Sequence, residues 1–99
     1  MTDRKLLELA AKAAGYDIDW SDWLDCGSHT KYKNRTTGQW WNAEHDDGDA
    51  FRLAVKLHLP VEAVIAFVAQ RETDWETDPY AATRRAIVRA AAEIGKVMT

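Results

Sequence analysis

The sequence predicts an α+β fold, in which about three helices lie on the faces of a small, mainly antiparallel sheet. Apolar residues recur every three or four positions near both ends of the chain and again after position 46, as on one face of a helix. Between 16 and 20 they alternate with polar residues, as in a half-buried strand. Elements in this order form packed layers around one core, and 99 residues suit a single domain, 1–99.

The N-terminal half is predicted to hold one helix and a hairpin besides the strand at 16–20. Thr2 caps the helix, and Gly15 supplies the left-handed residue that follows its last turn. The segments 31–33 and 39–41 are rich in aromatic and long side chains and flank a short polar loop that ends in glycine. This pattern is typical of two antiparallel strands joined by a tight connection.

A second helix is predicted after the acidic run in the middle of the chain. Asp46 or Asp47 caps it, because a carboxylate accepts hydrogen bonds from the free amides of a first turn. Phe51, Val55 and His58 recur at helical spacing and mark the face that we expect to be buried.

The next segment, 61–72, fits two structures. Its apolar residues have helical spacing, but they are rich in β-branched and aromatic types, and the apolar run has the length of a strand. We predict a strand, since another strand widens a thin sheet, with a helix as the alternative. The last helix begins at Asp78 and Pro79, a strong start signal, and we expect Gly95 to end it.

Composition and charge exclude several classes of function. The chain has 13 Lys and Arg against 16 Asp and Glu, a net charge of −3 with a pI near 5.5, which disfavours a general nucleic-acid binder. Its single cysteine, Cys26, excludes an internal disulfide and favours a reducing cytoplasm. The longest uncharged apolar stretch, 63–70, is far shorter than the ~20 residues of a transmembrane helix.

Several blocks of the sequence resemble the phage α-β-α sandwich domain proteins, a family of small proteins from phages and prophages of bacteria. The blocks are WN at 41–42, DDGDAFRLAVKL at 46–57, DPYAATRRAIVRAAAEIG at 78–95 and DRKLLELAAKAAG at 3–15. The resemblance implies three layers with the sheet in the middle and supports a strand at 61–72. It implies no reaction and assigns no catalytic residues.

Five Trp residues are the most unusual feature of the composition. Trp23 and Trp75 lie in acidic, irregular segments, and an exposed Trp within a charged rim is a common composition of binding surfaces. The alternative is that all five Trp residues build the core. We predict that a partner protein contacts Trp20, Trp23, Trp40, Trp75, Asp22, Asp74, Arg85 and Arg89.

Binding of a metal ion or a small molecule is an alternative reading of the potential ligands in the middle of the chain. These ligands are Cys26, His29, His45 and the acidic residues Asp46, Asp47 and Asp49. The acids lack the spacing of a calcium loop, and capping of the second helix explains them at once. A single cysteine with one nearby histidine also falls short of the three or four ligands that zinc requires.

Arginines of the last helix allow a third reading, in which the protein contacts nucleic acid. Arg85 and Arg89 are four residues apart and share a helix face, with Arg84 beside them. With a net charge of −3, a solvated helix face is the simpler explanation. No catalytic triad, phosphate loop or dinucleotide motif is present in the sequence, and we expect no enzymatic activity.

The expected function is therefore that of a phage or prophage accessory protein. It binds an unidentified host or phage protein in the bacterial cytoplasm through Trp side chains set among acidic residues. No cofactor, metal ion or membrane is expected to take part, and nucleic acid is disfavoured. A homo-oligomer is compatible with exposed aromatic residues, although no feature of the sequence specifies a symmetric interface.

Overall fold

The computed structural model describes residues 3–71 and 77–98. These residues form four helices and three strands. In chain order the elements are α1 (Asp3–Ala14), β1 (Ile18–Asp25), β2 (Thr30–Asn34), β3 (Gln39–Trp41), α2 (Asp47–Lys56), α3 (Val61–Arg71) and α4 (Pro79–Val97).

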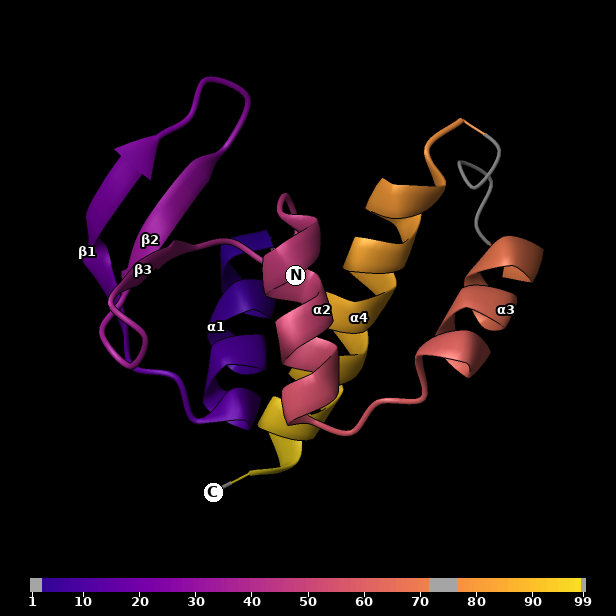
Figure 1. Cartoon of the computed structure of the whole chain (residues 1–99). Coiled ribbons are helices and arrows are strands. Elements are labelled where there is room, and N and C mark those ends of the chain that lie inside the picture. Colours follow the sequence, from indigo (N-terminus) through magenta and orange to yellow (C-terminus); the bar gives the residue numbers. More distant parts are fainter. Residues whose placement is uncertain (1–2, 72–76, 99) are drawn as a thin grey trace.

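The predicted α+β class is confirmed, and the arrangement is consistent with an α-β-α fold. The strands form one antiparallel sheet in the order β1-β2-β3, so β1 and β3 are its two edges. Figure 1 shows the sheet beside α1, with α2 and α4 next to α1 and with α3 on the side of α4 that faces away from the sheet. The described part of the chain contains one helix more than the three that the sequence predicts.

The additional helix is α3, so the predicted strand at 61–72 is wrong over its described part. The physical reason lies in length and composition. The segment Val61–Arg71 is longer than most strands, and its three alanines and terminal Gln and Arg favour a helix. Pro60 suits the start of a helix, and its carbonyl accepts the first hydrogen bond, from the amide of Val64. The alternative interpretation of this segment is the correct one.

The sheet contains the strand predicted near 16–20 and the two hairpin strands predicted at 31–33 and 39–41. The first of these, β1, runs beyond its predicted end. The pattern of alternating residues stops near Trp20 because the register shifts between Asp19 and Trp23. Within this bulge the carboxylate of Asp19 accepts two hydrogen bonds from Ser21, one from its amide (3.1 Å) and one from its hydroxyl (2.6 Å). A bulge turns a strand and re-aims its side chains, so pairing resumes with Trp23 opposite Tyr32.

The helix ends follow the predicted capping in most places. Asp46 caps α2 and Asp78 caps α4, each by accepting a hydrogen bond from an amide of the first turn. Gly15 has a positive φ after α1, as predicted. His58 also has a positive φ (55°) just after α2, where its amide donates to the carbonyl of Val55. The expectation that His58 lies on the buried face is therefore wrong, since it is the exposed residue that terminates this helix.

Small residues bring α1 and α4 close together. Ala10, Ala14 and Ala91 are buried between the elements of the core, and Leu53 of α2 is fully buried as well. Gly95 does not end α4, which continues to Val97, so the predicted stop is wrong. A side chain at this position would collide with the backbone carbonyl of Leu9, and this close approach explains the glycine.

We therefore expect Gly95→Ala to destabilise the protein, although alanine is the better helix former. The added methyl group would force α1 and α4 apart, at a cost of about 1–3 kcal/mol in the free energy of unfolding. Urea denaturation followed by circular dichroism measures the change in the free energy of unfolding. The matched control is Gly48→Ala in α2, where the new methyl group would meet only side chains, the Arg52 guanidinium at 3.1 Å and the Asp46 carboxylate at 3.2 Å, and no backbone of another helix. A Gly95→Ala protein as stable as the control would contradict the close contact.

Candidate functional site

The β1–β2 hairpin projects past the ends of the neighbouring helices (Figure 1). Its most exposed apolar side chains are Trp23 (59% exposed) and Leu24 (43%). Adjacent residues of a strand point to opposite faces, so the outer part of the hairpin lacks a buried face. A large aromatic side chain held in this position by a sheet is typical of an interaction surface.

Trp20 and Trp40 contribute less to the surface than predicted. Trp20 is half-buried, in edge contact with Tyr32 (ring centroids 4.9 Å apart) and Trp41 (6.5 Å). The guanidinium of Arg4 lies over its ring at 4.8 Å from the centroid, a cation–π contact that ties α1 to the sheet. Trp40 is also half-buried. Predicted residues Trp75 and Asp74 lie outside the described residues.

Two acidic residues lie on either side of Trp23 along β1. Asp22 and Asp25 are exposed on β1, and no ion pair involves either of them among the residues that the structure describes. Asp19, farther back in the strand, differs because it bonds to Ser21 and pairs with Arg35 at 2.9 Å, which lowers its pKa to about 2. The free negative charge of the hairpin therefore lies beside Trp23.

The outer edge of β1 offers unpaired backbone groups. The amide of Cys26 donates to the carbonyl of His29, which closes the hairpin turn with Gly27 at a positive φ. Hydrogen-bonded and non-hydrogen-bonded pairs alternate along antiparallel strands. The backbone groups of Trp23 and Asp25 therefore face away from β2, toward an edge at which no other strand of the described residues 3–71 and 77–98 pairs.

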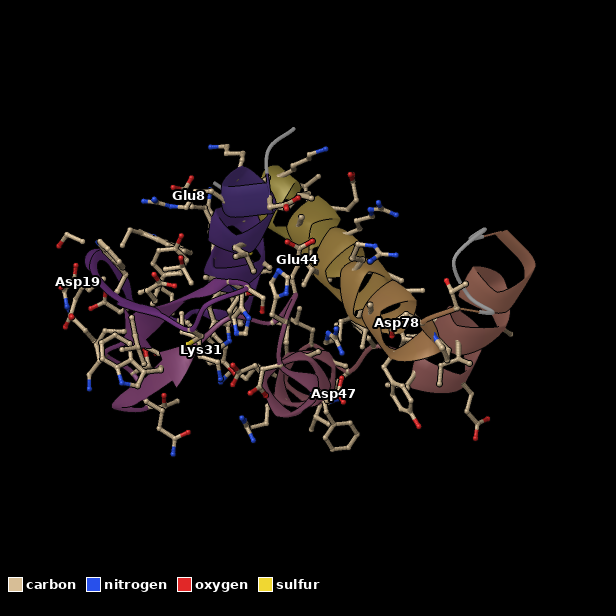
Figure 2. The ribbon with its side chains drawn as sticks, turned by 90° about the horizontal axis from the view of Figure 1, so that it is seen from above. Glu8, Asp19, Lys31, Glu44, Asp47 and Asp78 are labelled. Atoms are coloured by element: carbon tan, nitrogen blue, oxygen red, sulfur yellow. The ribbon has the colours of Figure 1, made fainter. Side chains whose placement is uncertain are left out.

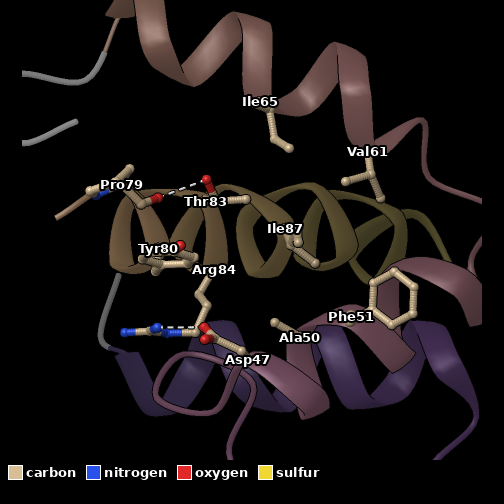
Figure 3. A pocket seen from close by; sticks show the side chains of 10 residues that line it. All are labelled: Asp47, Ala50, Phe51, Val61, Ile65, Pro79, Tyr80, Thr83, Arg84 and Ile87. Carbon is tan, nitrogen blue, oxygen red and sulfur yellow. Dashed lines mark hydrogen bonds and ion pairs between the residues drawn. The ribbon is translucent and has the colours of Figure 1, made fainter. Parts of the chain in front are cut away.

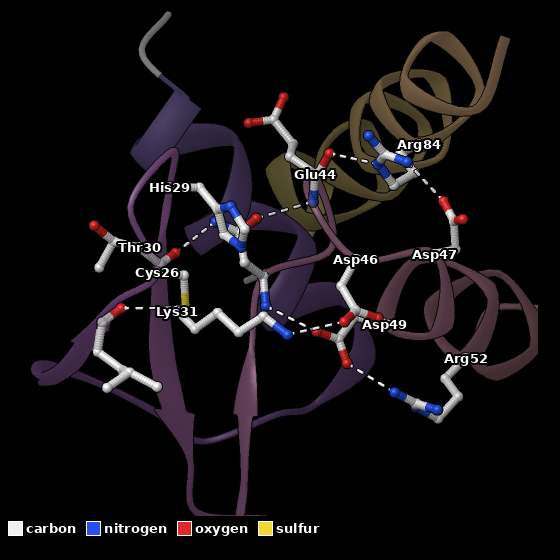
Figure 4. A network of polar contacts seen from close by, with 12 residues as sticks. Cys26, His29, Thr30, Lys31, Glu44, Asp46, Asp47, Asp49, Arg52 and Arg84 are labelled. Carbon is white, nitrogen blue, oxygen red and sulfur yellow. Dashed lines mark hydrogen bonds and ion pairs between the residues drawn. The ribbon is translucent and has the colours of Figure 1, made fainter. Parts of the chain in front are cut away.

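A polar network fastens the base of the hairpin to the start of α2 (Figure 4). Lys31 pairs with Asp46 at 2.8 Å, and the side-chain amide of Asn42 donates to the carbonyl of Thr30 at 2.7 Å. The hydrogen bond between Lys31 and Asp46 raises the pKa of the lysine and lowers that of the carboxyl group. Asp46 also caps α2, so the same carboxylate holds both elements.

The imidazole rings of His29 and His45 stack beside this network, with centroids 4.7 Å apart and planes within 4° of parallel. Burial and the neighbouring His29 lower the pKa of His45. No group of three or more His, Cys, Asp or Glu side chains in the described chain is arranged to hold a metal ion. Cys26 is exposed, and its thiol contacts the carbonyl of Leu24 at 3.8 Å. The ligands of the metal-binding alternative are thus not assembled.

Arg84 does not belong to a free basic patch. Its guanidinium donates to the carbonyl of Glu44 (2.8 Å) and to the carboxylate of Asp47 (2.7 Å), and its side chain is only 18% exposed. Arg85 is half-buried and Arg89 is exposed. Burial raises the pKa of Glu44, and the charges of Arg85 and Arg89 partly oppose this shift. These arginines are on α4, a different element from Trp23.

Sequence reasoning missed a second apolar surface, on α2 and α4. Phe51 and Val55 were expected to be buried, but they are 60% and 57% exposed. Small and branched residues of the same helix, Ala50, Leu53 and Ala54, form its buried face instead. The signal was present in the sequence, because apolar residues occupy more of the helix circumference than one buried face requires.

Comparisons with known proteins found no relative. No family model, no curated protein and no solved structure matches the chain. The resemblance to the phage family therefore stays a prediction. None of the helices in the described part of the chain is long and apolar enough to cross a membrane.

Replacing two tryptophans tests their different positions. We expect Trp41→Ala to lower the free energy of unfolding by about 3–5 kcal/mol, because Trp41 is only 3% exposed and packs in the core. Trp23→Ala should change it by less than about 0.5 kcal/mol. Chemical denaturation of both variants measures the difference. Comparable losses of stability would show that Trp23 is also a core residue.

The stacked histidines predict a pH dependence. The pKa of His45 in the folded chain lies below its ordinary value, so the unfolded chain binds a proton first as the pH falls. The contribution of His45 to stability should therefore decrease below about pH 6.5. We expect the melting temperature of the wild-type protein to fall more steeply between pH 7 and pH 5 than that of His45→Gln. Parallel curves for the two proteins would contradict the assignment.

Proposed function

We propose that this chain is a non-enzymatic protein-binding module, an accessory protein of a phage or prophage that acts in the bacterial cytoplasm. One observation carries the proposal of binding: the hairpin presents Trp23 at 59% exposure on an edge strand with unpaired backbone groups. The resemblance of several sequence blocks to a phage family supports the origin, and the single cysteine of the chain supports the location.

The proposed mode of binding is addition of a partner strand to the free edge of β1. Backbone hydrogen bonds to Trp23 and Asp25 would supply part of the affinity, because each unpaired amide and carbonyl gains a partner. The Trp23 ring would enter an apolar depression of the partner, as large aromatic anchors do. Asp22 and Asp25 favour a partner segment that carries Lys or Arg, and they speed its approach.

Quantitative affinity capture tests this proposal. The tagged chain is incubated with bacterial lysate, with and without phage infection, and bound proteins are measured by mass spectrometry. A true partner should be enriched by the wild-type chain and lost with Trp23→Ala. The matched control is Tyr80→Ala, which removes another exposed aromatic ring from a different element. No protein that depends on Trp23 in either lysate would refute the proposal.

A purified partner then allows a test of strand addition itself. Asp25→Pro removes the outward amide together with the carboxylate, whereas Asp25→Ala removes the carboxylate alone, and both variants lose the hydrogen bond that the carboxylate accepts from the amide of Gly27 (2.9 Å). We expect the proline variant to bind at least about tenfold more weakly than the alanine variant, and Trp23→Ala to lose about as much. Binding of wild type should also weaken as salt rises from about 50 to 500 mM, because the acidic rim is then screened. Equal affinities for the two Asp25 variants would exclude strand addition.

A further inference from the structure

The open edge of β1 also restricts the sequence of a strand that pairs with it. Trp23 and Asp25 lie on one face of β1 and Leu24 lies on the other, because neighbouring residues of a strand point to opposite faces. In an added strand, one residue lies directly opposite each of these three and shares its face. The surroundings of each β1 residue therefore define the side chain that suits the partner at that position.

A small cavity lies on the Trp23 face, between the hairpin and α1. It has a volume of about 230 Å³, and its lining residues are Arg4, Trp20, Trp23, Thr30 and Tyr32. Trp23 and Tyr32 are directly opposite each other on β1 and β2, so both rings belong to the same face of the sheet. The cavity is smaller than those that hold drug-sized ligands, and it suits a single large side chain.

Arg4 makes this cavity a poor place for a cation. Its guanidinium pairs with Glu8 at 3.3 Å and lies over the rings of Trp20 and Tyr32, at 4.8 and 5.4 Å from their centroids. A lysine of the partner would meet this guanidinium where it needs an open ring face. Aromatic residues directly opposite each other on neighbouring strands stabilise a sheet. An aromatic side chain is therefore the one that suits the position opposite Trp23.

Asp25 shares the face of Trp23 but presents a negative charge. Its carboxylate accepts a hydrogen bond from the amide of Gly27 at 2.9 Å, and it forms no ion pair within residues 3–71 and 77–98. Opposite charges on directly opposed strand residues attract each other, whereas like charges there destabilise the pairing. The position opposite Asp25 therefore suits Lys or Arg.

Leu24 determines the other face of the edge, where it is 43% exposed. Its neighbour across the hairpin is Lys31, whose ammonium pairs with Asp46 at 2.8 Å and whose side chain is only 22% exposed. Figure 2 shows Lys31 on the side of the sheet toward α2. Because the charge of Lys31 is already compensated, a partner residue opposite Leu24 meets mainly apolar atoms. An apolar side chain suits this position.

We propose that the partner strand runs antiparallel to β1 and carries, from its N-terminal to its C-terminal side, Lys or Arg, an apolar residue and an aromatic residue. These three residues lie opposite Asp25, Leu24 and Trp23, in that order. Both strand pairs of this sheet are antiparallel, and antiparallel pairing is the more stable kind per residue. The inference rests on the binding function proposed above and adds the order of residues that the edge recognises.

A library of cyclic β-hairpin peptides tests this order. Each peptide presents one free strand edge with three consecutive random positions, and the library is selected on the full wild-type chain and counter-selected on Trp23→Ala. We expect enrichment of the order cationic, apolar, aromatic. Enrichment of Trp23-dependent peptides with another composition, or with the reversed order, would overturn the inference and leave binding at the edge intact. If no peptide depends on Trp23, the inference is also wrong, and the capture from lysate decides the proposed function separately.

Double-mutant cycles on an enriched peptide test the register. Asp25→Asn removes the charge but keeps an oxygen that accepts from the amide of Gly27. Fluorescence anisotropy should show a coupling of about two- to fivefold in affinity between the peptide cation and Asp25, and a similar coupling between the peptide aromatic ring and Trp23. Stronger coupling in the crossed pairs, cation with Trp23 and ring with Asp25, would contradict the register.

Salt and a remote variant distinguish recognition at this edge from general attraction. The coupling to Asp25 should decrease as salt rises from about 50 to 500 mM, whereas the coupling to Trp23 should persist. The matched control is Tyr80→Ala, whose exposed ring lines the apolar groove between α2, α3 and α4 (Figure 3). This variant should bind the peptide normally. Equal losses with Tyr80→Ala and Trp23→Ala would overturn the inference.

Self-association of the chain provides the last check. Analytical ultracentrifugation of the wild-type chain at micromolar concentration should show a monomer. A wild-type dimer that Trp23→Ala dissociates would show that a second copy of this chain covers the edge, and it would overturn the proposed partner strand.

Discussion

The close contact between α1 and α4 is the constraint on which the rest of the structure depends. Gly95 lies against the backbone at Leu9, and buried alanines of both helices fill the remaining space. Such an interface buries little side-chain volume, so larger apolar groups must pack elsewhere. Leu53 of α2 and Trp41 of β3 extend the same core. The sheet and α2 thus complete a core that two alanine-rich helices begin.

This arrangement leaves two surfaces with apolar groups in solvent. The sheet is longer than the helical layer beside it, so the hairpin reaches past the helices and exposes Trp23 and Leu24. On the other side, α3 stands apart from α2 across the floor of α4, and the groove opens between them. The ion pair between Lys31 and Asp46 joins the two regions, because Asp46 also caps α2. The position of the hairpin and the start of α2 are therefore set by one carboxylate.

Local chemistry predicted much of the fold from the sequence. Asp78 with Pro79 predicted the start of α4, Asp46 that of α2, and Gly15 the end of α1, because capping depends on neighbouring residues only. The same reasoning wrongly predicted that α4 ends at Gly95. A glycine that ends a helix cannot be distinguished in sequence from a glycine that lets another backbone pack closely. The strand predicted for the segment of α3 was wrong as well, because a short apolar run with β-branched residues has no unique periodicity.

The candidate site was predicted less completely than the fold. Trp23 is exposed, as the predicted partner contact requires, although it lies on β1 and not in the irregular segment that the sequence indicated, and Asp22 beside it is exposed too. Trp20 was not distinguishable from Trp23, since the bulge after Asp19 decides which ring faces the core, and a bulge leaves no clear mark in a single sequence. The exposure of Phe51 was not predicted, because the exposure of an apolar residue on a helix depends on which neighbouring elements cover it. Both surfaces result from tertiary packing.

Amide hydrogen exchange measured by NMR on the free chain tests the central claim most directly, namely that β1 presents an open edge at Trp23. The account predicts fast exchange for the amides of Trp23 and Asp25 and slow exchange for that of Leu24, which faces β2. Protection of all three amides in a monomeric chain would show that the edge is already covered. Such a result would contradict a binding site for a partner strand at this edge.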